Sequence, residues 1–168
     1  MTEFTRVDQP VDGDERSVLL GWLAFYRNAL EAKCQGLSPE QLVERAVPPS
    51  TLCLLGLVRH LTEMERAYAV WALGPDIPLD WVWGVYTEGG PALDFEATAE
   101  MTIESFAAWD QERRSADALI GAYDSLDQKG SGNGHTLRWN LMKLIGEYAR
   151  HCGQADLLRE RIDGSTGE

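Results

Sequence analysis

Two histidines and one glutamate have the residue types and the helical spacing of a metal-binding site. His60 follows Leu57 by three residues and precedes Met64 by four, so its imidazole is predicted to share the buried side of a helix. Glu147 and His151 are four residues apart in a later helical segment, which places a carboxylate and an imidazole on one face. A buried carboxylate without a partner is costly, so a cation shared with the histidines would satisfy these groups.

The ligand set indicates which ion would bind. Two imidazoles and one carboxylate are typical of catalytic zinc sites, in which three protein ligands leave a fourth position for water or substrate. The same set suits non-haem Fe(II) and Ni(II). The alternative is structural: Glu147 and His151 form an ordinary i,i+4 pair on a partly solvated face, and His60 is a hydrogen-bonded core histidine. The spacing alone leaves both interpretations open.

The cysteines and the third histidine give weaker signals. Cys152 follows His151 directly, but adjacent helical residues point about 100° apart, so a thiolate–imidazole pair is not expected. Cys34, Cys53 and Cys152 are an odd number at wide spacings, which predicts reduced thiols rather than disulfides. His135 lies in a glycine-rich segment just before a predicted helix start, and we do not expect it to bind metal.

Four long amphipathic segments must position these residues. The spacing of apolar residues predicts helices at about 14–35, 54–73, 97–123 and 136–161. No alternating strand pattern occurs in the sequence. We therefore predict an all-α fold, a four-helix bundle, as a single domain over residues 1–168.

Three connections join the predicted helices. Ser38 to Gln41 has the pattern of an N-cap, a proline at the first helical position and a capping-box partner, which predicts a short helical turn. Residues 75–96 contain three prolines and several aromatics without helical periodicity, so we predict a long loop between the second and third helices. Its tryptophans either cover one end of the bundle or form a substrate lid. Residues 130–134, rich in Gly, Ser and Asn, are expected to be a flexible connection.

Each helix is predicted to bury one face. The stripe predicted for the first helix is Leu19, Trp22, Tyr26, Ala29 and Lys33. In the second helix, Arg59, Glu63 and Arg66 lie on a side away from the apolar stripe. In the third, Ile103 is expected in the core and Glu112 in solvent.

Composition and charge narrow the range of partners. Fifteen Lys and Arg against 27 Asp and Glu give a formal charge of −12, and no basic cluster offsets it, so nucleic acid is not an expected partner. No apolar run approaches the ~20 residues needed to cross a bilayer. The start of the chain is polar and acidic, unlike a secretory signal. We expect a cytoplasmic protein without a membrane segment.

Two stretches of the sequence resemble the signature regions of the DinB-like superfamily. They are LLGLVRHLTEMERAY at 54–68, followed by Trp71, and TLRWNLMKLIGEYARHCGQADLLRERIDGSTG at 136–167. The chain is similar to an actinobacterial branch of small proteins related to mycothiol-dependent maleylpyruvate isomerase. The resemblance implies a four-helix bundle, often a homodimer, that holds a divalent metal through one residue of the second helix and two of the last. Those positions are His60, Glu147 and His151 here.

Four positions depart from the pattern HxIEEYARHNGH of that branch. This chain has Lys143 for the first histidine, Gly146 for the first glutamate, Cys152 for the asparagine and Gln154 for the last histidine. If the working ligands include those histidines, metal binding would be weak or absent, because an ammonium cannot ligate and an amide is a poor ligand. Gln154 is instead expected to hydrogen-bond a ligand or a bound water.

The resemblance leaves two functions open. The first is a metal-dependent transferase or isomerase that uses a small thiol such as mycothiol as cosubstrate, with the metal activating the thiol. The alternative is a non-catalytic, stress-related bundle that binds metal or ligand at a degenerate site. The motif does not specify the substrate, because loop 75–96 and the helix ends would line the pocket.

Overall fold

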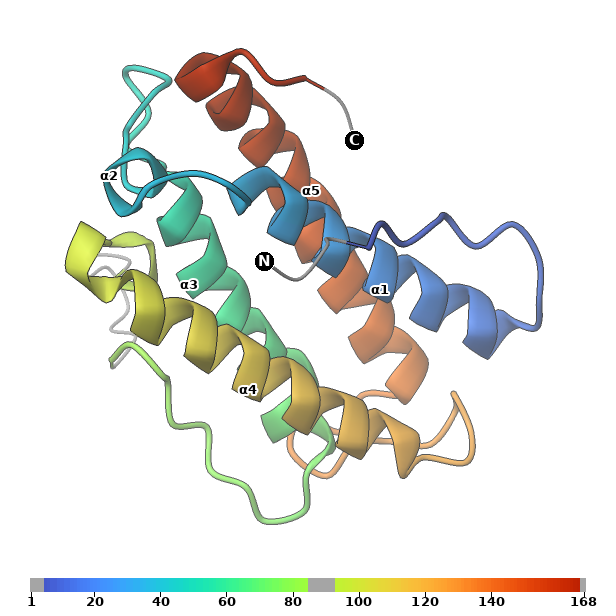
Figure 1. Cartoon of the computed structure of the whole chain (residues 1–168). Helices are drawn as coiled ribbons and strands as arrows, with labels where there is room; N and C mark the ends of the chain where they lie inside the picture. The colour runs from blue at the N-terminus through green and yellow to red at the C-terminus, as the bar shows by residue number, and fades with distance from the viewer. Residues whose placement is uncertain (1–4, 85–92, 167–168) are drawn as a thin grey trace.

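Four long helices form the bundle in a computed structural model that describes residues 5–84 and 93–166. They are α1 (Glu15–Cys34), α3 (Leu54–Glu65), α4 (Thr102–Gly121) and α5 (Leu137–Asp163), with a short α2 (Pro39–Leu42) between α1 and α3 (Figure 1). Helices and their connections account for the described ranges, which contain no β-strand. The predicted all-α bundle is confirmed.

The second predicted helix keeps its predicted length but changes its geometry. After Glu65, α3 continues through a π-helical segment, Arg66–Trp71, and the helical run ends at Leu73. The third predicted helix begins later than expected. Two single turns of 3-10 helix, Leu93–Phe95 and Ala99–Met101, precede α4.

Local capping fixes where the helices begin and end. The Ser38 hydroxyl accepts the backbone N–H of Gln41, and the Gln41 side chain accepts the N–H of Ser38, so the predicted capping box is confirmed. The Thr136 hydroxyl accepts the N–H of Trp139 at the start of α5. Gly164 ends α5 with a positive φ of 78°, a conformation that glycine adopts without strain.

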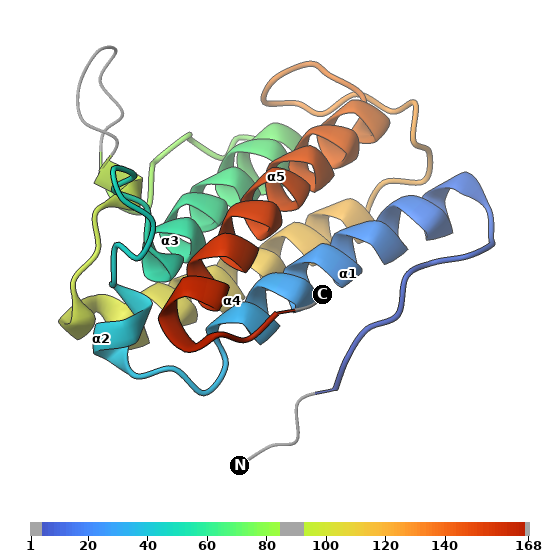
Figure 2. The same cartoon turned by 90° about the horizontal axis from the view of Figure 1, so that it is seen from above.

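The helix α3 contacts the other three long helices. It packs against both α4 and α5, while α1 packs mainly against α5 (Figure 2). Leu57 and Leu61 are fully buried, as their stripe predicts, but Leu55 and Val58 on other sides of the helix are fully buried as well. Because most side chains of α3 are buried, few of its positions are open to solvent, and charged residues of this helix lie in the interior.

The predicted exposure or burial was wrong at several positions. Arg59 and Glu63 are buried, because residues 81–83 of the long loop cover that side of α3. Glu112 is also buried and pairs with Arg66 across the α3–α4 contact, at 2.8 Å between Nη2 and Oε1. Ile103 is 85% exposed instead of buried. It lies in the first turn of α4, whereas Trp109 and Ala116 farther along the helix are buried.

The helix α1 buries one face, as predicted, but this face is rotated from the predicted one. Its most deeply buried apolar residues are Leu23 and Leu30. Tyr26 and Ala29, members of the predicted stripe, are only partly buried at the edge of the core. Helical periodicity gave the right helix, but the direction of its partner α5 was needed to choose the buried face.

The long loop runs back along α3 in its described parts (Figure 1). The backbone N–H groups of Val82 and Trp83 donate to the Glu63 carboxylate at 3.0 and 2.7 Å, and the Trp83 indole N–H donates to the carbonyl of Arg59 at 3.0 Å. The predicted loop is confirmed there, and Trp83 covers the side of α3 rather than an end of the bundle. Tyr86, predicted among the loop aromatics, lies outside the described residues.

The glycine-rich connection before α5 packs closely against the end of α3. The N–H of Gly132 donates to the carbonyl of Ala72 at 3.1 Å. A Cβ atom on Gly132 would lie 2.2 Å from the carbonyl oxygen of Trp71, and one on Gly130 would lie 2.1 Å from that of Ala72. The expected flexible connection was therefore wrong, since the glycines permit close backbone contact here.

Charged and polar side chains join all four long helices in the core. The Arg27 guanidinium donates to both oxygens of Glu65 at 2.7 and 2.6 Å, and to Asp117 at 2.7 Å. The Tyr148 hydroxyl donates to Glu65 at 2.7 Å and accepts the indole N–H of Trp109 at the same distance. Glu65, fully buried on α3, is the centre of this network.

We expect Glu65→Gln to lower the free energy of unfolding by about 3 kcal/mol or more, because the buried Arg27 loses its ionised partner in the core. Urea unfolding followed by far-ultraviolet circular dichroism measures the change. As a control, Asp110→Asn breaks partly exposed pairs with Arg113 and Arg114 and should cost less than about 1 kcal/mol. A similar small cost for both variants would contradict the central role of Glu65.

Candidate metal centre

His60, Glu147 and His151 meet between α3 and α5. His151 Nε2 lies 3.7 Å from Glu147 Oε2, and His60 Nε2 lies 4.0 Å from the same oxygen. The two imidazole centroids are 4.6 Å apart. One potential ligand atom of each residue lies within 4.8 Å of the other two. The structure thus brings together the three residues that the sequence predicts as ligands.

The antiparallel arrangement of α3 and α5 creates this meeting point. His60 contacts His151, and further along α3 the Tyr68 ring contacts Trp139, so α5 runs in the opposite direction. Glu147 and His151 are one turn apart on α5, which places both side chains opposite the single histidine of α3.

An aspartate at the end of the long loop orients His60. Asp94 Oδ2 lies 2.6 Å from His60 Nδ1, and the Phe95 ring stacks on the imidazole with centroids 4.3 Å apart. Burial opposes ionisation of Asp94, but the hydrogen bond and charge of His60 lower its pKa below the usual value. With Nδ1 held by the carboxylate, His60 directs Nε2 toward Glu147.

Gly56 allows this loop segment to approach α3. It lies one turn before His60, and a Cβ atom there would be 2.6 Å from the carbonyl oxygen of Phe95. Only a residue without a side chain permits this contact. Sequence reasoning missed Asp94 and Phe95, because a loop has no periodicity that relates it to a helix face. The sole signal was an acidic residue in a long loop of unusual composition.

His151 has one ring nitrogen without a partner. Its Nδ1 lies 2.7 Å from the amide oxygen of Gln154, and an amide oxygen can only accept a hydrogen bond, so Nδ1 carries the proton. Its Nε2 is buried and has no hydrogen-bond partner among the described residues. Burial lowers the pKa of His151, which favours the neutral ring with a free lone pair on Nε2. Gln154 therefore hydrogen-bonds the candidate ligand His151, as the sequence predicts.

Two cations hold Glu147 in its ionised form. Lys143 Nζ lies 2.7 Å from Oε1, and Arg150 Nη1 lies 3.3 Å from Oε2. Burial alone would raise the pKa of Glu147, but the Lys143 hydrogen bond and the charges of Lys143 and Arg150 lower it. Lys143, which replaces a histidine of the related pattern, therefore contributes an ion pair and not a ligand.

The residues present fit a divalent metal ion. Two imidazole nitrogens and one carboxylate oxygen converge, and the buried Nε2 of His151 lacks the partner that a buried polar atom normally has. Ligands about 2.0–2.1 Å from a tetrahedral zinc are roughly 3.4 Å apart, close to the separations from Glu147 to each histidine.

The remaining candidates from the sequence lie outside this centre. Cys34, Cys53 and Cys152 are buried free thiols, as predicted. Burial raises the pKa of Cys152 to about 12, so it is a core thiol and not a nucleophile. His135 is exposed and packs on the Trp139 ring at 4.1 Å, away from the three converging residues.

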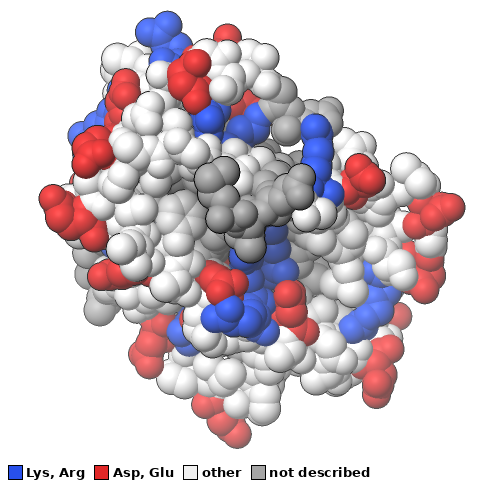
Figure 3. Space-filling model, viewed as in Figure 1, with Lys and Arg blue, Asp and Glu red and all other residues white. Residues whose placement is uncertain are grey.

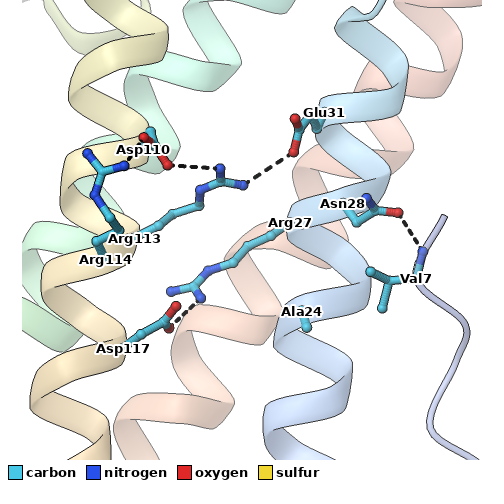
Figure 4. A pocket seen from close by; sticks show the side chains of 9 residues that line it. All are labelled: Val7, Ala24, Arg27, Asn28, Glu31, Asp110, Arg113, Arg114 and Asp117. Atoms are coloured by element: carbon cyan, nitrogen blue, oxygen red, sulfur yellow. Dashed lines mark hydrogen bonds and ion pairs between the residues drawn. The ribbon is translucent and has the colours of Figure 1, made fainter. Parts of the chain in front are cut away.

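A groove of about 280 Å³ lies between α1 and α4, away from the three converging residues (Figure 4). Figure 3 shows basic side chains gathered along the middle of this face. Figure 4 shows why they hold no free charge, since Arg27 pairs with Asp117 and Arg113 pairs with Glu31. These interactions connect the two helices and leave no unpaired ionic group for a ligand.

Comparison with known proteins agrees with the geometry. The model of a family described as mycothiol-S-transferase matches residues 18–164, which include all three converging residues. No curated protein and no solved structure gave a significant match. None of the helices in the described part of the chain is long and apolar enough to cross a membrane.

We expect Asp94→Asn and Gln154→Ala each to lower metal affinity by about tenfold to a hundredfold, because each removes the group that orients a histidine. Competition with a chromophoric chelator measures the affinity. Asp80→Asn, an exposed change in the same long loop as Asp94, is the control and should bind as the parent does. If either variant lost metal binding as completely as a variant without one of the three candidate ligands, these supporting roles would be wrong.

Proposed function

The chain belongs to the mycothiol-S-transferase family, within the DinB-like superfamily, and we propose that it is a metal-dependent transferase that uses a small thiol such as mycothiol. The observation that carries the proposal is the convergence of His60 Nε2, His151 Nε2 and Glu147 Oε2, with the His151 nitrogen buried and unpartnered. Three protein ligands are the number that leaves a coordination position for a substrate.

A divalent ion in this centre would lower the pKa of a thiol at its open position and so supply a thiolate near neutral pH. In the transfer, the thiol sulfur forms a bond to an electrophilic carbon of an acceptor. The thiol proton passes to solvent, and the leaving group of the acceptor departs with the electron pair of the bond that breaks. The reaction therefore needs no oxidant or reductant.

The chain's own residues hold and shape the site. His60, Glu147 and His151 would hold the ion, while Asp94 and Gln154 fix the two imidazole orientations. Phe95 covers one face of the His60 ring. The ligand set suits zinc best, with nickel or iron as the other candidates.

The Lys143–Glu147 ion pair favours a second function, a non-catalytic bundle with a degenerate site. The ammonium already neutralises the carboxylate at 2.7 Å, which reduces the electrostatic gain from binding a metal. In this case the two histidines would be structural, and the protein would bind other small molecules without thiol transfer.

We expect purified protein, prepared without an affinity tag or chelator, to contain one divalent ion per chain. His60→Ala, Glu147→Ala and His151→Ala should each abolish metal binding, because each removes one of three ligands. Elemental analysis checks this. His135→Ala, which removes an exposed histidine outside the centre, should keep its metal. Equal metal content in all of these proteins would favour the degenerate site.

We further expect mycothiol or a simple analogue to raise the melting temperature of the metal-loaded protein. The apo protein and His60→Ala should be unchanged, because binding then requires the ion. Differential scanning fluorimetry measures the shift. Equal stabilisation of loaded and apo protein would show that the thiol binds elsewhere, and no stabilisation at millimolar thiol would support the non-catalytic function.

A further inference from the structure

Two exposed cations flank Glu147 along α5. Lys143 lies one turn before it and Arg150 three residues after it, with side chains 37% and 62% exposed. Lys143 also lies 5.4 Å from the ring of Tyr68. Lys143 and Arg150 both pair with Glu147. Within the described residues, neither cation makes an ion pair with another carboxylate. The candidate metal centre therefore has more positive charge on its rim than one carboxylate neutralises.

Asp94, paired with His60, balances this surplus before an ion binds, so the net local charge would come from a bound divalent ion. With Lys143, Arg150, Glu147 and the nearby Asp94 counted, the local charge becomes +2 in a protein whose formal charge is −12. In a partly buried site, such a surplus is weakly screened and attracts anions. Repulsion from the acidic surface is screened beyond about 8 Å at physiological ionic strength.

The surface between the two cations is open. Gly146 lies between Lys143 and Arg150 along α5, and a Cβ atom there would meet no atom within 4 Å. A glycine inside a helix costs about 1 kcal/mol relative to alanine, so helix stability does not account for it. The missing side chain leaves room for a ligand group beside the metal centre.

We propose that the acceptor substrate carries an anionic group, in the simplest case a carboxylate, which binds between Lys143 and Arg150 over Gly146. The inference rests on the proposed thiol transfer and names the class of its acceptor. A thiolate and a carboxylate together neutralise the +2 surplus. A guanidinium can bind a carboxylate through two parallel hydrogen bonds, which would align the acceptor toward the metal centre.

Three small probes test this in the zinc-loaded protein by isothermal titration calorimetry at low ionic strength. They are 3-mercaptopropionate, its neutral amide 3-mercaptopropionamide, and propionate. We expect the mercaptocarboxylate to bind about tenfold to a hundredfold more tightly than the amide, because it adds charged hydrogen bonds. Raising the salt concentration should reduce this preference.

Gly146→Glu and Gly146→Ala form the matched pair of variants. The glutamate places a carboxylate between the two cations, in a space that is free in the parent, and should remove the preference for the mercaptocarboxylate. The alanine replaces the same glycine in the helix but adds no charge. Gly146→Ala should therefore still bind the mercaptocarboxylate more tightly than the amide. Zinc content is measured in both, so that loss of the ion is not mistaken for loss of anion binding.

The outcomes separate this inference from the proposed function. Equal affinity of the parent for the two thiols would overturn the anionic acceptor and leave thiol binding intact. Binding of propionate alone, weakened by Gly146→Glu, would support the anion site and argue against the thiol function. If none of the three probes bound, both proposals would be wrong.

Discussion

The burial of most side chains of α3, charged ones included, is the constraint on which the rest of the structure depends. A polar group removed from water must find a partner in the protein, and both buried glutamates of α3 receive theirs from neighbouring elements. Glu65 receives Arg27 from α1 and Tyr148 from α5. Glu63 receives two backbone N–H groups from the long loop. These interactions fix the arrangement of the helices and hold the loop along the bundle.

The same constraint builds the candidate metal centre and shows where it is incomplete. Asp94 satisfies Nδ1 of His60, and Gln154 satisfies Nδ1 of His151. The buried Nε2 of His151 has no partner in the described protein, which sets it apart from most polar atoms around it. A metal ion would satisfy that nitrogen together with His60 and Glu147, so the gap in the hydrogen bonding has a chemical explanation.

The departures from the related sequence pattern change the charge of the centre and leave the three candidate ligands in place. Lys143 and Gly146 stand where that pattern has a histidine and a glutamate, which makes the rim more positive. Gly146 also leaves the surface between Lys143 and Arg150 open. In physical terms, a chain with these residues is better suited to hold two anions than a neutral substrate.

The sequence by itself determined the approximate helices, several of their caps and the shared face of Glu147 and His151. These depend on local rules: the period of the helix relates Glu147 to His151, and Ser38 and Thr136 satisfy nearby N–H groups. Only the tertiary structure decided that Glu63 is buried and that Asp94 reaches His60. A helical period shows which residues share a face, but the element that packs against that face comes from distant parts of the chain, and a loop has no period at all.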